Sequence, residues 1–364
     1  MAEGYTFQSV NSWIKSGIIP FRFLPSLSVP LESHAGLRVG VGRRQGGRMA
    51  WLPAVLPVDE QLGFFLGMFV ADGSATKTYV RIDIGLSEPD LLETTCKTVE
   101  SLFGISPRVY KERWARMHVV QINSAGLVRV LERVFGLPGS SEKGKLKVPD
   151  LIFNSGESAA RGFVEGLIAG DGYIRKRRRF INIATKSREL QNQLGFLAAR
   201  LGLTFRIARQ RTASHPLYTV NFVGPETLGK ITDWEFLKDE HRAVARSWTT
   251  EGRSGTCTHA RYERLPIKAS DFLALTKATR TSSNPRVGPT SRACPSVVRQ
   301  KVDRMRRRRL REEQTEQMLR IERLVGSDVG FVFVRSVKEL VSRPEYVYCL
   351  QLDDSEMAGF VTGE

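Results

Sequence analysis

The sequence predicts an α+β protein built from two similar halves, each with the element order α-β-β-α-β-β-α. The first observation behind this prediction is a pair of apolar helical stretches, residues 65–73 and 164–172, that both end in Asp-Gly. The second is that the elements after each stretch come in the same order and at nearly the same spacing. The third is the alternation of apolar and polar residues after each helix, which is typical of half-buried strands in small antiparallel sheets.

Each apolar stretch carries two small residues four positions apart, Gly67 and Ala71 in the first stretch and Gly166 and Gly170 in the second. Residues i and i+4 lie on the same face of a helix, so each small pair leaves a shallow strip on the helix surface. The backbone of another helix can approach that strip closely. The spacing therefore predicts that the two helices pack against each other.

Asp72 and Asp171 close the two stretches, and each is followed by a glycine that we expect to take positive φ and end the helix. If the helices pack together, the two carboxylates lie side by side. The helix dipole does not explain acids at this position, because a carboxylate is disfavoured at a helix C-terminus. We interpret the pair as a divalent metal site; the alternative is that the two residues only cap their helices.

Both stretches resemble the LAGLIDADG motif of the dodecapeptide (DOD-type) homing endonucleases. Asp72 and Asp171 fall on the metal-binding position of the motif, whereas Val70 and Ala169 replace its non-catalytic Asp. One such nonapeptide is a weak signal, but two of them 99 residues apart (171 minus 72) are a strong one. The resemblance implies that the two antiparallel sheets form a saddle over the DNA major groove, with the motif helices at a pseudo-twofold axis.

The charge balance favours a polyanionic partner. The chain has 364 residues, 41% of them hydrophobic, with a formal net charge of +17 and a pI near 10.0. Such an excess of basic residues suits binding to phosphates; the alternative is a protein from an arginine-rich proteome. Four cysteines without CxxC spacing predict reduced thiols and an intracellular protein. Because no apolar run is long enough for a membrane span, we also expect a soluble protein.

The first half, residues 59–150, follows residues 1–58, where short apolar runs alternate with Pro and Gly and predict strands and turns without a helix. In the first half, Ser87 is a candidate N-cap for the second helix and Gly104 its stop. The elements expected after the motif helix are strands at 79–85, 108–111 and 118–123 and helices at 90–103 and 125–135.

The second half, residues 151–250, repeats this order. Gly104 and Gly202 are 98 positions apart (202 minus 104), close to the spacing of the two aspartates, so the repeat keeps its register. The elements expected after the second motif helix are strands within 173–185 and at 204–209 and 218–223, a helix at 188–201 and another from about 225.

The pattern changes beyond residue 250. Residues 251–330 combine a linker rich in Ser, Thr, Gly and Pro with one long charged helix at 296–325, which either lies on DNA or is solvated and balanced by its own glutamates. Residues 331–364 return to strand character, with alternation at 346–352. This tail resembles the C-terminal region of inteins but lacks their terminal His-Asn, so we interpret it and residues 1–58 as remnants of a splicing domain.

The resemblance assigns metal binding to Asp72 and Asp171, which would hold Mg²⁺ or Mn²⁺ because such hard cations prefer oxygen ligands. The backbone carbonyls of Ala71 and Gly170 are further candidate ligands. Together they would place metal ions at the scissile phosphates of double-stranded DNA.

The family also places a basic residue near each site. In the first half its usual position is occupied by Leu146, and Lys147 beside it is our candidate for that catalytic role. In the second half Lys238, Arg242 and Arg246 are alternatives that no motif separates. Gln121 and Asn123 could read bases or only form hydrogen bonds at a sheet edge.

Basic residues recur on the predicted strands and turns of both halves, with little acid among them. Because Arg and Lys can contact both phosphates and guanine edges, we predict that they bind DNA. These candidates are Arg81, Arg108, Lys111, Arg113, Arg116, Arg175, Arg177, Arg206, Arg209 and Arg211.

The function these observations predict is a monomeric, site-specific, Mg²⁺-dependent double-strand DNA endonuclease derived from an intein. Three alternatives remain, the first two of them on the same scaffold. They are a catalytically inactive DNA-binding protein, an RNA maturase, and part of a self-splicing intein.

Overall fold

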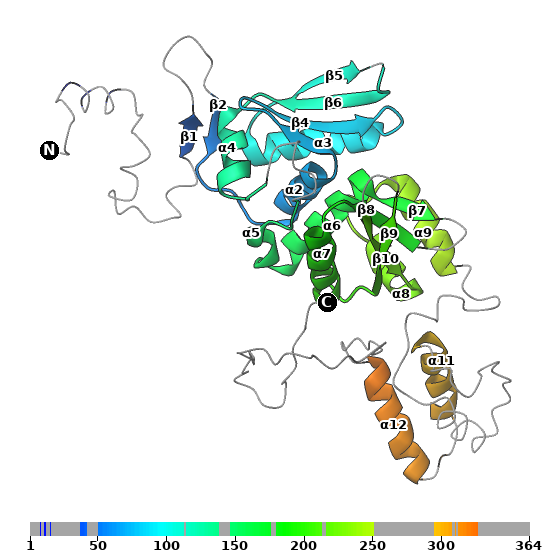
Figure 1. Cartoon of the computed structure of the whole chain (residues 1–364). Helices are drawn as coiled ribbons and strands as arrows, with labels where there is room; N and C mark the ends of the chain where they lie inside the picture. Colours follow the sequence, from blue (N-terminus) through cyan, green and yellow to red (C-terminus); the bar gives the residue numbers. More distant parts are fainter. Residues whose placement is uncertain are drawn as a thin grey trace, which may run out of the picture.

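The computed structural model describes residues 8, 11, 15, 37–41, 50–112, 114–137, 146–175, 180–212, 216–250, 295–307, 310 and 312–326. Two αββαββα units follow one another along the chain, as predicted (Figure 1). The first consists of α2 (Glu60–Asp72), β3 (Gly73–Ala75), β4 (Val80–Gly85), α3 (Pro89–Phe103), β5 (Arg108–Glu112), β6 (Met117–Ile122) and α4 (Ala125–Arg133).

The second unit begins after the short helix α5 (Asp150–Phe153). It ends with an additional helix, α9, that the sequence did not predict. Its elements are α6 (Glu157–Asp171), β7 (Tyr173–Arg175), β8 (Phe180–Thr185), α7 (Arg188–Arg200), β9 (Phe205–Arg211), β10 (Pro216–Val223), α8 (Pro225–Thr232) and α9 (Asp239–Thr250).

The two four-stranded sheets have the same topology. Their strand orders are β3-β4-β6-β5 and β7-β8-β10-β9, and every neighbouring pair is antiparallel. In each unit the motif helix leads directly into the first strand of the sheet. The predicted repeat is therefore confirmed at the level of strand order and pairing.

Helices α2 and α6 lie side by side between the two sheets and pack backbone to backbone (Figure 1). A Cβ added to Gly67 would lie well under 3.0 Å from the carbonyl oxygen of Phe163, and one added to Gly166 would meet the carbonyl oxygen of Phe64 in the same way. The predicted packing of the small residues is thus confirmed.

A third small pair, which the sequence interpretation missed, extends this contact by one helical turn. A Cβ on Gly63 would collide with the carbonyl of Ala159, and one on Gly162 would collide with the carbonyl of Glu60. Because contacts at the starts of both helices are followed by contacts nearer their ends, α2 and α6 run in the same direction. Only glycine lets backbones approach this closely.

The glycines after the two aspartates end their helices in a different way from the one predicted. Gly73 has φ −87° and Gly172 has φ −69°, so both are extended rather than left-handed, and the prediction of positive φ is wrong. Glycine is needed there because a Cβ would strike the carbonyl oxygen of Phe69 or Ile168, one turn earlier. Gly104 and Gly202 do adopt the left-handed conformation expected of helix stops, with φ 63° and 60°.

Side-chain caps start three of the helices. Asp59, Ser124 and Ser187 accept hydrogen bonds from backbone N–H groups at the first turns of α2, α4 and α7. Ser87 does not cap α3 as predicted. Glu88 occupies that position without a side-chain cap, and Pro89 at the first helical position supplies a favourable φ instead.

The predicted single helix at 296–325 is two helices, α11 (Pro295–Arg306) and α12 (Glu312–Gly326). Each of the two helices has an apolar stripe. The chain folds back between them, so the stripe of α11 is buried against that of α12. Arg299 donates a hydrogen bond to the carbonyl of Val325 at 2.9 Å, and Arg306 pairs with Glu322. The buried residues of this hairpin are Val298, Val302, Met305, Met318, Ile321 and Val325.

The described residues before α2 include a two-stranded antiparallel hairpin, β1 (Arg38–Val41) and β2 (Ala50–Pro53), which agrees with the predicted strands. Residues 8, 11 and 15 are helical, however, so the prediction of no helix before residue 59 does not hold there. The tail 331–364, with its predicted strand at 346–352, lies outside the described residues.

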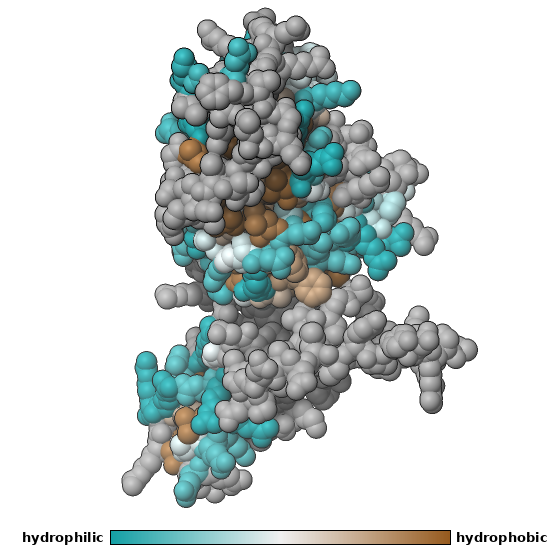
Figure 2. Space-filling view, turned by 90° about the vertical axis from the view of Figure 1, so that its left-hand side faces the viewer, coloured by the Kyte–Doolittle hydropathy of each residue, from teal (hydrophilic) through white to brown (hydrophobic). Residues whose placement is uncertain are grey.

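One apolar core runs through both units, because α2 and α6 contribute to it from opposite sides of their contact. Phe64 of α2 stacks on Phe236 of the second unit, with ring centroids 4.5 Å apart. Figure 2 shows one face of the molecule, on which hydrophilic residues cover the described parts at the top and bottom and apolar residues gather in the upper middle. Among the described helices, none combines the length and apolarity that crossing a membrane requires.

Substituting Gly67→Ala should destabilise the fold by about 2–4 kcal/mol, because the added methyl group meets backbone atoms that cannot rotate away. Gly229→Ala is the matched control, since a Cβ there meets nothing within 4 Å. In α8 it should stabilise the helix by up to about 1 kcal/mol. Urea unfolding measures both; equal effects of the two substitutions would contradict the proposed backbone contact.

Candidate active site and nucleic-acid interface

Asp72 and Asp171 are brought together at the adjacent ends of α2 and α6. Ala71 lies against Gly170, and Oδ2 of Asp72 is 3.4 Å from the position that a Cβ of Gly170 would occupy. The next residue in the chain is Asp171. The side chain of Asp72 is half-buried, whereas Asp171 is exposed to solvent.

This arrangement suits a divalent metal ion that takes few ligands from the protein. Within the described ranges, no group of three or more His, Cys, Asp and Glu residues is gathered as a metal site. Mg²⁺ commonly binds through one or two carboxylates and completes its coordination with water and phosphate oxygens. Two aspartates that adjoin a solvent-exposed surface fit that donor set, and the close approach of Ala71 to Gly170 is what positions them.

Lys147, the predicted catalytic base of the first half, lies on a segment that runs along α7. The carbonyl of Leu146 accepts a hydrogen bond from Ser187 at the start of α7, while Arg200 at its end donates to the carbonyl of Gly156, just before α6. The Nζ of Lys147 contacts both carboxylate oxygens of Asp150, at 3.0 and 3.1 Å.

The three second-half alternatives differ in their contacts. Lys238 forms an ion pair with Glu88 of the first unit, which ties the two units together. Arg242 donates to the carbonyl oxygens of Thr232 and Trp234 and so satisfies the end of α8. These contacts give Lys238 and Arg242 structural roles, and the choice among Lys238, Arg242 and Arg246 stays a prediction.

The strand register assigns each predicted DNA-binding residue of the first sheet to a face. The side facing the helices carries Ile82 and Val120, which are paired across the strands and belong to the core. Gln121 follows Val120 on β6, so its side chain points to the opposite, outward face. Arg81 and Arg108 pair with Gln121 from the two neighbouring strands and therefore lie on the same outward face. Lys111 pairs with His118 and so lies on the helix-facing side, at the edge of the sheet.

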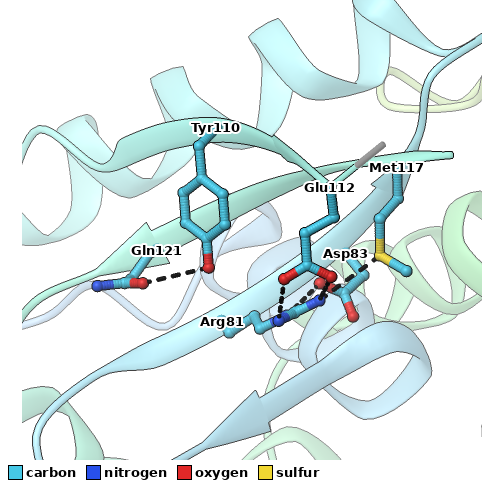
Figure 3. Close-up of polar contacts among 6 residues, drawn as sticks. All are labelled: Arg81, Asp83, Tyr110, Glu112, Met117 and Gln121. Carbon is cyan, nitrogen blue, oxygen red and sulfur yellow. Dashed lines mark hydrogen bonds and ion pairs between the residues drawn. The ribbon is translucent and has the colours of Figure 1, made fainter. Parts of the chain in front are cut away.

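Acidic side chains share the outward face of the first sheet, contrary to the expectation of little acid there. Arg81 donates through Nε to Asp83 at 2.5 Å and through Nη1 and Nη2 to Glu112 at 2.9 and 3.1 Å (Figure 3). These hydrogen bonds raise the pKa of Arg81 further above its already high value. The alternation of charge at Arg81 and Asp83 was the sequence signal for this cluster, and it was overlooked.

The second sheet separates its basic residues in the same way. Arg206 pairs with Asn221, which pairs with Asn182, and this row lies on the outward face. Arg209 pairs with Tyr218 on the other face and lies over its ring, 5.9 Å from the centroid. The amide of Asn182 donates to that of Asn221 at 2.8 Å.

Several predicted DNA contacts cannot be placed on a face. Arg116 adopts a left-handed backbone, with φ 53°, in the β5–β6 turn. Arg113 and Arg177 lie outside the described residues, as do the side chains of Arg175 and Arg211.

The two candidate base-reading residues of the first sheet contact each other. Gln121 donates to Asn123 at 2.7 Å and accepts from the hydroxyl of Tyr110 at 3.4 Å. Gln121 lies in the same row as Arg81 and Ser74, one register step from Gly73, the β3 residue that follows Asp72.

Residues 59–135 and 158–233 each match the family described as the LAGLIDADG-like domain. The chain carries two LAGLIDADG-like domains. The two matched segments contain the paired motif helices and the two sheets described above.

Similar curated proteins share only a part of their length with this chain. An ATP-dependent DNA helicase Hel308 of Thermococcus kodakarensis is 30% identical over 183 residues, which are 47% of this chain and 16% of the helicase. A DNA-directed RNA polymerase subunit Rpo1C of Methanocaldococcus jannaschii is 25% identical (42% and 17%). An A-type ATP synthase subunit of Pyrococcus abyssi is 28% identical (54% and 18%). The chain thus spans less than a fifth of each of these relatives.

Solved structures with distant similarity include variants of the homing endonuclease I-DmoI, with 15% identity and a TM-score of 0.39 over 52% of this chain and 98% of that chain. I-DmoI in complex with DNA and Ca has 16% identity and a TM-score of 0.38, again over 52% and 98%. Full-length DUF199/WhiA from Thermatoga maritima has 10% identity and a TM-score of 0.39 over 73% and 81%.

A buried carboxyl group, Glu165, distinguishes the motif helix of the second LAGLIDADG-like domain from that of the first, where Leu66 stands one residue before the corresponding glycine. Glu165 has no exposed surface, and neither of its oxygens has a hydrogen-bond partner of normal geometry within the described chain. Burial, together with the nearby Glu60, raises the pKa of Glu165 to about 8. The composition of the motif did not reveal this residue, because a Glu on a helix is usually exposed.

An ion pair and a buried histidine are further polar features of this interface between the LAGLIDADG-like domains. Arg161 of α6 forms a bidentate pair with Glu60 at the start of α2. Close by in sequence to Lys238, the buried imidazole of His241 has a pKa lowered to about 4 by burial and by the charge of Lys238.

Glu165 and His241 predict a fall in stability above neutral pH. Between pH 4.5 and 8 the folded protein keeps the Glu165 proton that the unfolded chain releases, so the unfolding free energy falls by up to about 1.4 kcal/mol per pH unit. Between pH 4 and 6.5 unprotonated His241 gives the opposite slope. The two slopes of the unfolding free energy cancel between pH 4.5 and 6.5. Only the Glu165 contribution remains between pH 6.5 and 8, so stability falls there.

Urea unfolding at a series of pH values measures this dependence. Glu165→Gln, which cannot ionise, should remove the fall between pH 6.5 and 8, whereas His241→Gln should keep it. A parent protein with constant stability over that range would show that Glu165 does not hold its proton in the fold.

Proposed function

We propose that this protein is a site-specific, divalent-metal-dependent double-strand DNA endonuclease. The observation that carries the proposal is the convergence of Asp72 and Asp171 at the ends of two helices that pack through glycine. Two LAGLIDADG-like domains in one chain supply one acid each, which suits a reaction that cuts two strands.

Hydrolysis of a phosphodiester requires an activated water molecule and relief of the negative charge on the phosphate and the leaving oxygen. Asp72 and Asp171 would hold Mg²⁺ or Mn²⁺, and the carbonyls of Ala71 and Gly170 are available beside them. A bound metal ion would supply charge neutralisation and lower the pKa of its water. Lys147 is the candidate basic residue of the first half, and Lys238, Arg242 and Arg246 are the candidates of the second half.

We place the DNA along the outward faces of the two sheets. Arg108 and Arg206 occupy equivalent, exposed positions there and can contact phosphates or guanine. Lys111 and Arg209 lie on the other faces at the outer strands, where they could reach only the flanking backbone. The net charge of +17 supports a duplex as the partner of a single chain with internal pseudo-twofold symmetry.

An intein origin is also part of the proposal. The relatives are a helicase, a component of RNA polymerase and a component of an ATP synthase, and the matched stretch makes up only 16–18% of each. A shared segment in proteins of unrelated function is what we expect of an inserted element. This chain would then descend from such an element and act alone, within the cell.

Asp72→Asn and Asp171→Asn should each lower cleavage by about a thousandfold or more while leaving DNA binding nearly unchanged, because the proposed phosphate contacts lie on the sheets. The measurement is cleavage of a plasmid library with Mg²⁺, followed by sequencing of the ends. Asp233→Asn, an exposed acid at the end of α8, is the control and should cut like the parent. Removal of the metal with EDTA should also abolish cutting.

The same assay separates the alternatives. A parent protein that binds duplex DNA but never cuts it would be an inactive DNA-binding protein. A protein that binds RNA in preference to the duplex would be a maturase. Cleavage by Asp171→Asn at the parental rate would rule out the proposed metal site.

A further inference from the structure

The cluster of Arg81, Asp83 and Glu112 occupies the part of the first sheet next to the end of α2. Gly73, which follows Asp72, pairs with Ile82, so Asp83 comes one register step beyond that pair. Figure 3 shows the three side chains converging from β4 and β5, with Met117 of β6 beside them. Nη2 of Arg81 is 3.6 Å from the sulfur of Met117.

Arg81 is committed to the two carboxylates rather than offered to DNA. Three of the five N–H donors of its guanidinium are used by Asp83 and Glu112. With one positive and two negative charges, the cluster carries a net charge of −1, on the face of a protein whose overall charge is +17. A cluster of this sign repels phosphate.

The cluster has no counterpart in the second sheet, although the strand registers of the two sheets correspond residue by residue. Ser74, Arg81, Gln121 and Arg108 form one row of the first sheet; Tyr173, Asn182, Asn221 and Arg206 form the equivalent row of the second. Counting from these rows, Ala184 stands where the first sheet has Asp83, and Gln210 stands where it has Glu112. The second sheet therefore lacks both acids.

Stability accounts for only part of the cluster. The three side chains are 23%, 32% and 18% exposed, so they are partly buried, and the bidentate Arg81–Glu112 pair contributes to folding. Asp83, the most exposed of the three, uses Oδ1 for Arg81. Its Oδ2 accepts no hydrogen bond from the described residues, so it can accept one from outside the protein.

We propose that Asp83, held by Arg81 and buttressed by Glu112, is a specificity determinant that reads cytosine in the major groove. This inference rests on the proposed function, since it assumes that the outward face meets DNA. A carboxylate accepts a hydrogen bond from the N4 amino group of cytosine and repels the acceptor atoms of guanine and thymine. Because Asp83 lies next to the Asp72 end of α2, the base pair is near the position of cleavage in the first half-site.

The two halves consequently use different chemistry. The first sheet gains base selectivity at the expense of phosphate attraction, while the second keeps an acid-free face with the Asn182–Asn221 amide pair and Arg206. Such a protein recognises an asymmetric target although its fold is nearly twofold symmetric.

The test converts the first sheet to the residues of the second with the double variant Asp83→Ala/Glu112→Gln. Binding is measured without divalent metal on a randomised duplex library, as base preference at each position and as the salt dependence of affinity. The variant should lose about tenfold or more of its cytosine preference at one central position of one half-site. Freed Arg81 should bind phosphate and steepen the slope of log K against log salt by about 1.

Two further variants keep the result interpretable. Glu93→Gln/Glu100→Gln changes the net charge equally on exposed positions of α3, and should alter neither base preference nor the slope by a comparable amount. Asp83→Asn keeps an acceptor for Arg81 and should lose part of the preference while melting at a temperature close to that of the parent.

Each outcome decides one question. If the parent binds no DNA, the proposed function fails. If the parent binds DNA selectively and the double variant shows the same base preferences and salt slope, the cluster is only a structural ion pair and the inference is overturned, even where the melting temperature has fallen.

Discussion

The contact between the backbones of α2 and α6 is the constraint on which the rest of the structure depends. At Gly63 and Gly67 of α2 and at Gly162 and Gly166 of α6, a carbonyl oxygen of the partner helix lies where a side chain would collide, and the methyl group of Ala71 packs against Gly170. Such a contact leaves no room for a larger side chain or for a shift of either helix toward the other. It therefore fixes the relative position of the two halves. The ends of the two helices, and with them Asp72 and Asp171, are positioned as a consequence.

The interface also carries features that a purely apolar contact would not need. Glu165 is buried with a raised pKa beside the Glu60–Arg161 pair, and Lys238 reaches across the chain to Glu88. Burying a carboxyl group costs stability unless it stays protonated, and burial together with the charge of Glu60 favours the protonated form here. The first motif helix has Leu66 at the same place, so this cost is confined to one half.

The two sheets show how a duplicated fold can lose the symmetry of its outward side chains while keeping its topology. Strand order and register are the same in both, and Arg108 and Arg206 occupy equivalent positions. The charges around them differ, because Arg81 is neutralised by acids that the second sheet lacks. Backbone hydrogen bonds determine strand order and register, whereas the outward side chains can change without altering either of them.

The sequence by itself determined the duplicated order of elements, the helix packing and the two candidate metal ligands, because periodicity, glycine spacing and alternation are local properties of the chain. It misjudged what depends on distant neighbours. The glycines after the aspartates are extended since the preceding turn blocks a Cβ, and the charged helix at 296–325 folds back because its two apolar stripes bury each other. Only the tertiary structure decided which basic residues face outward and which are already paired, since strand register and cross-strand partners bring together residues far apart in the chain.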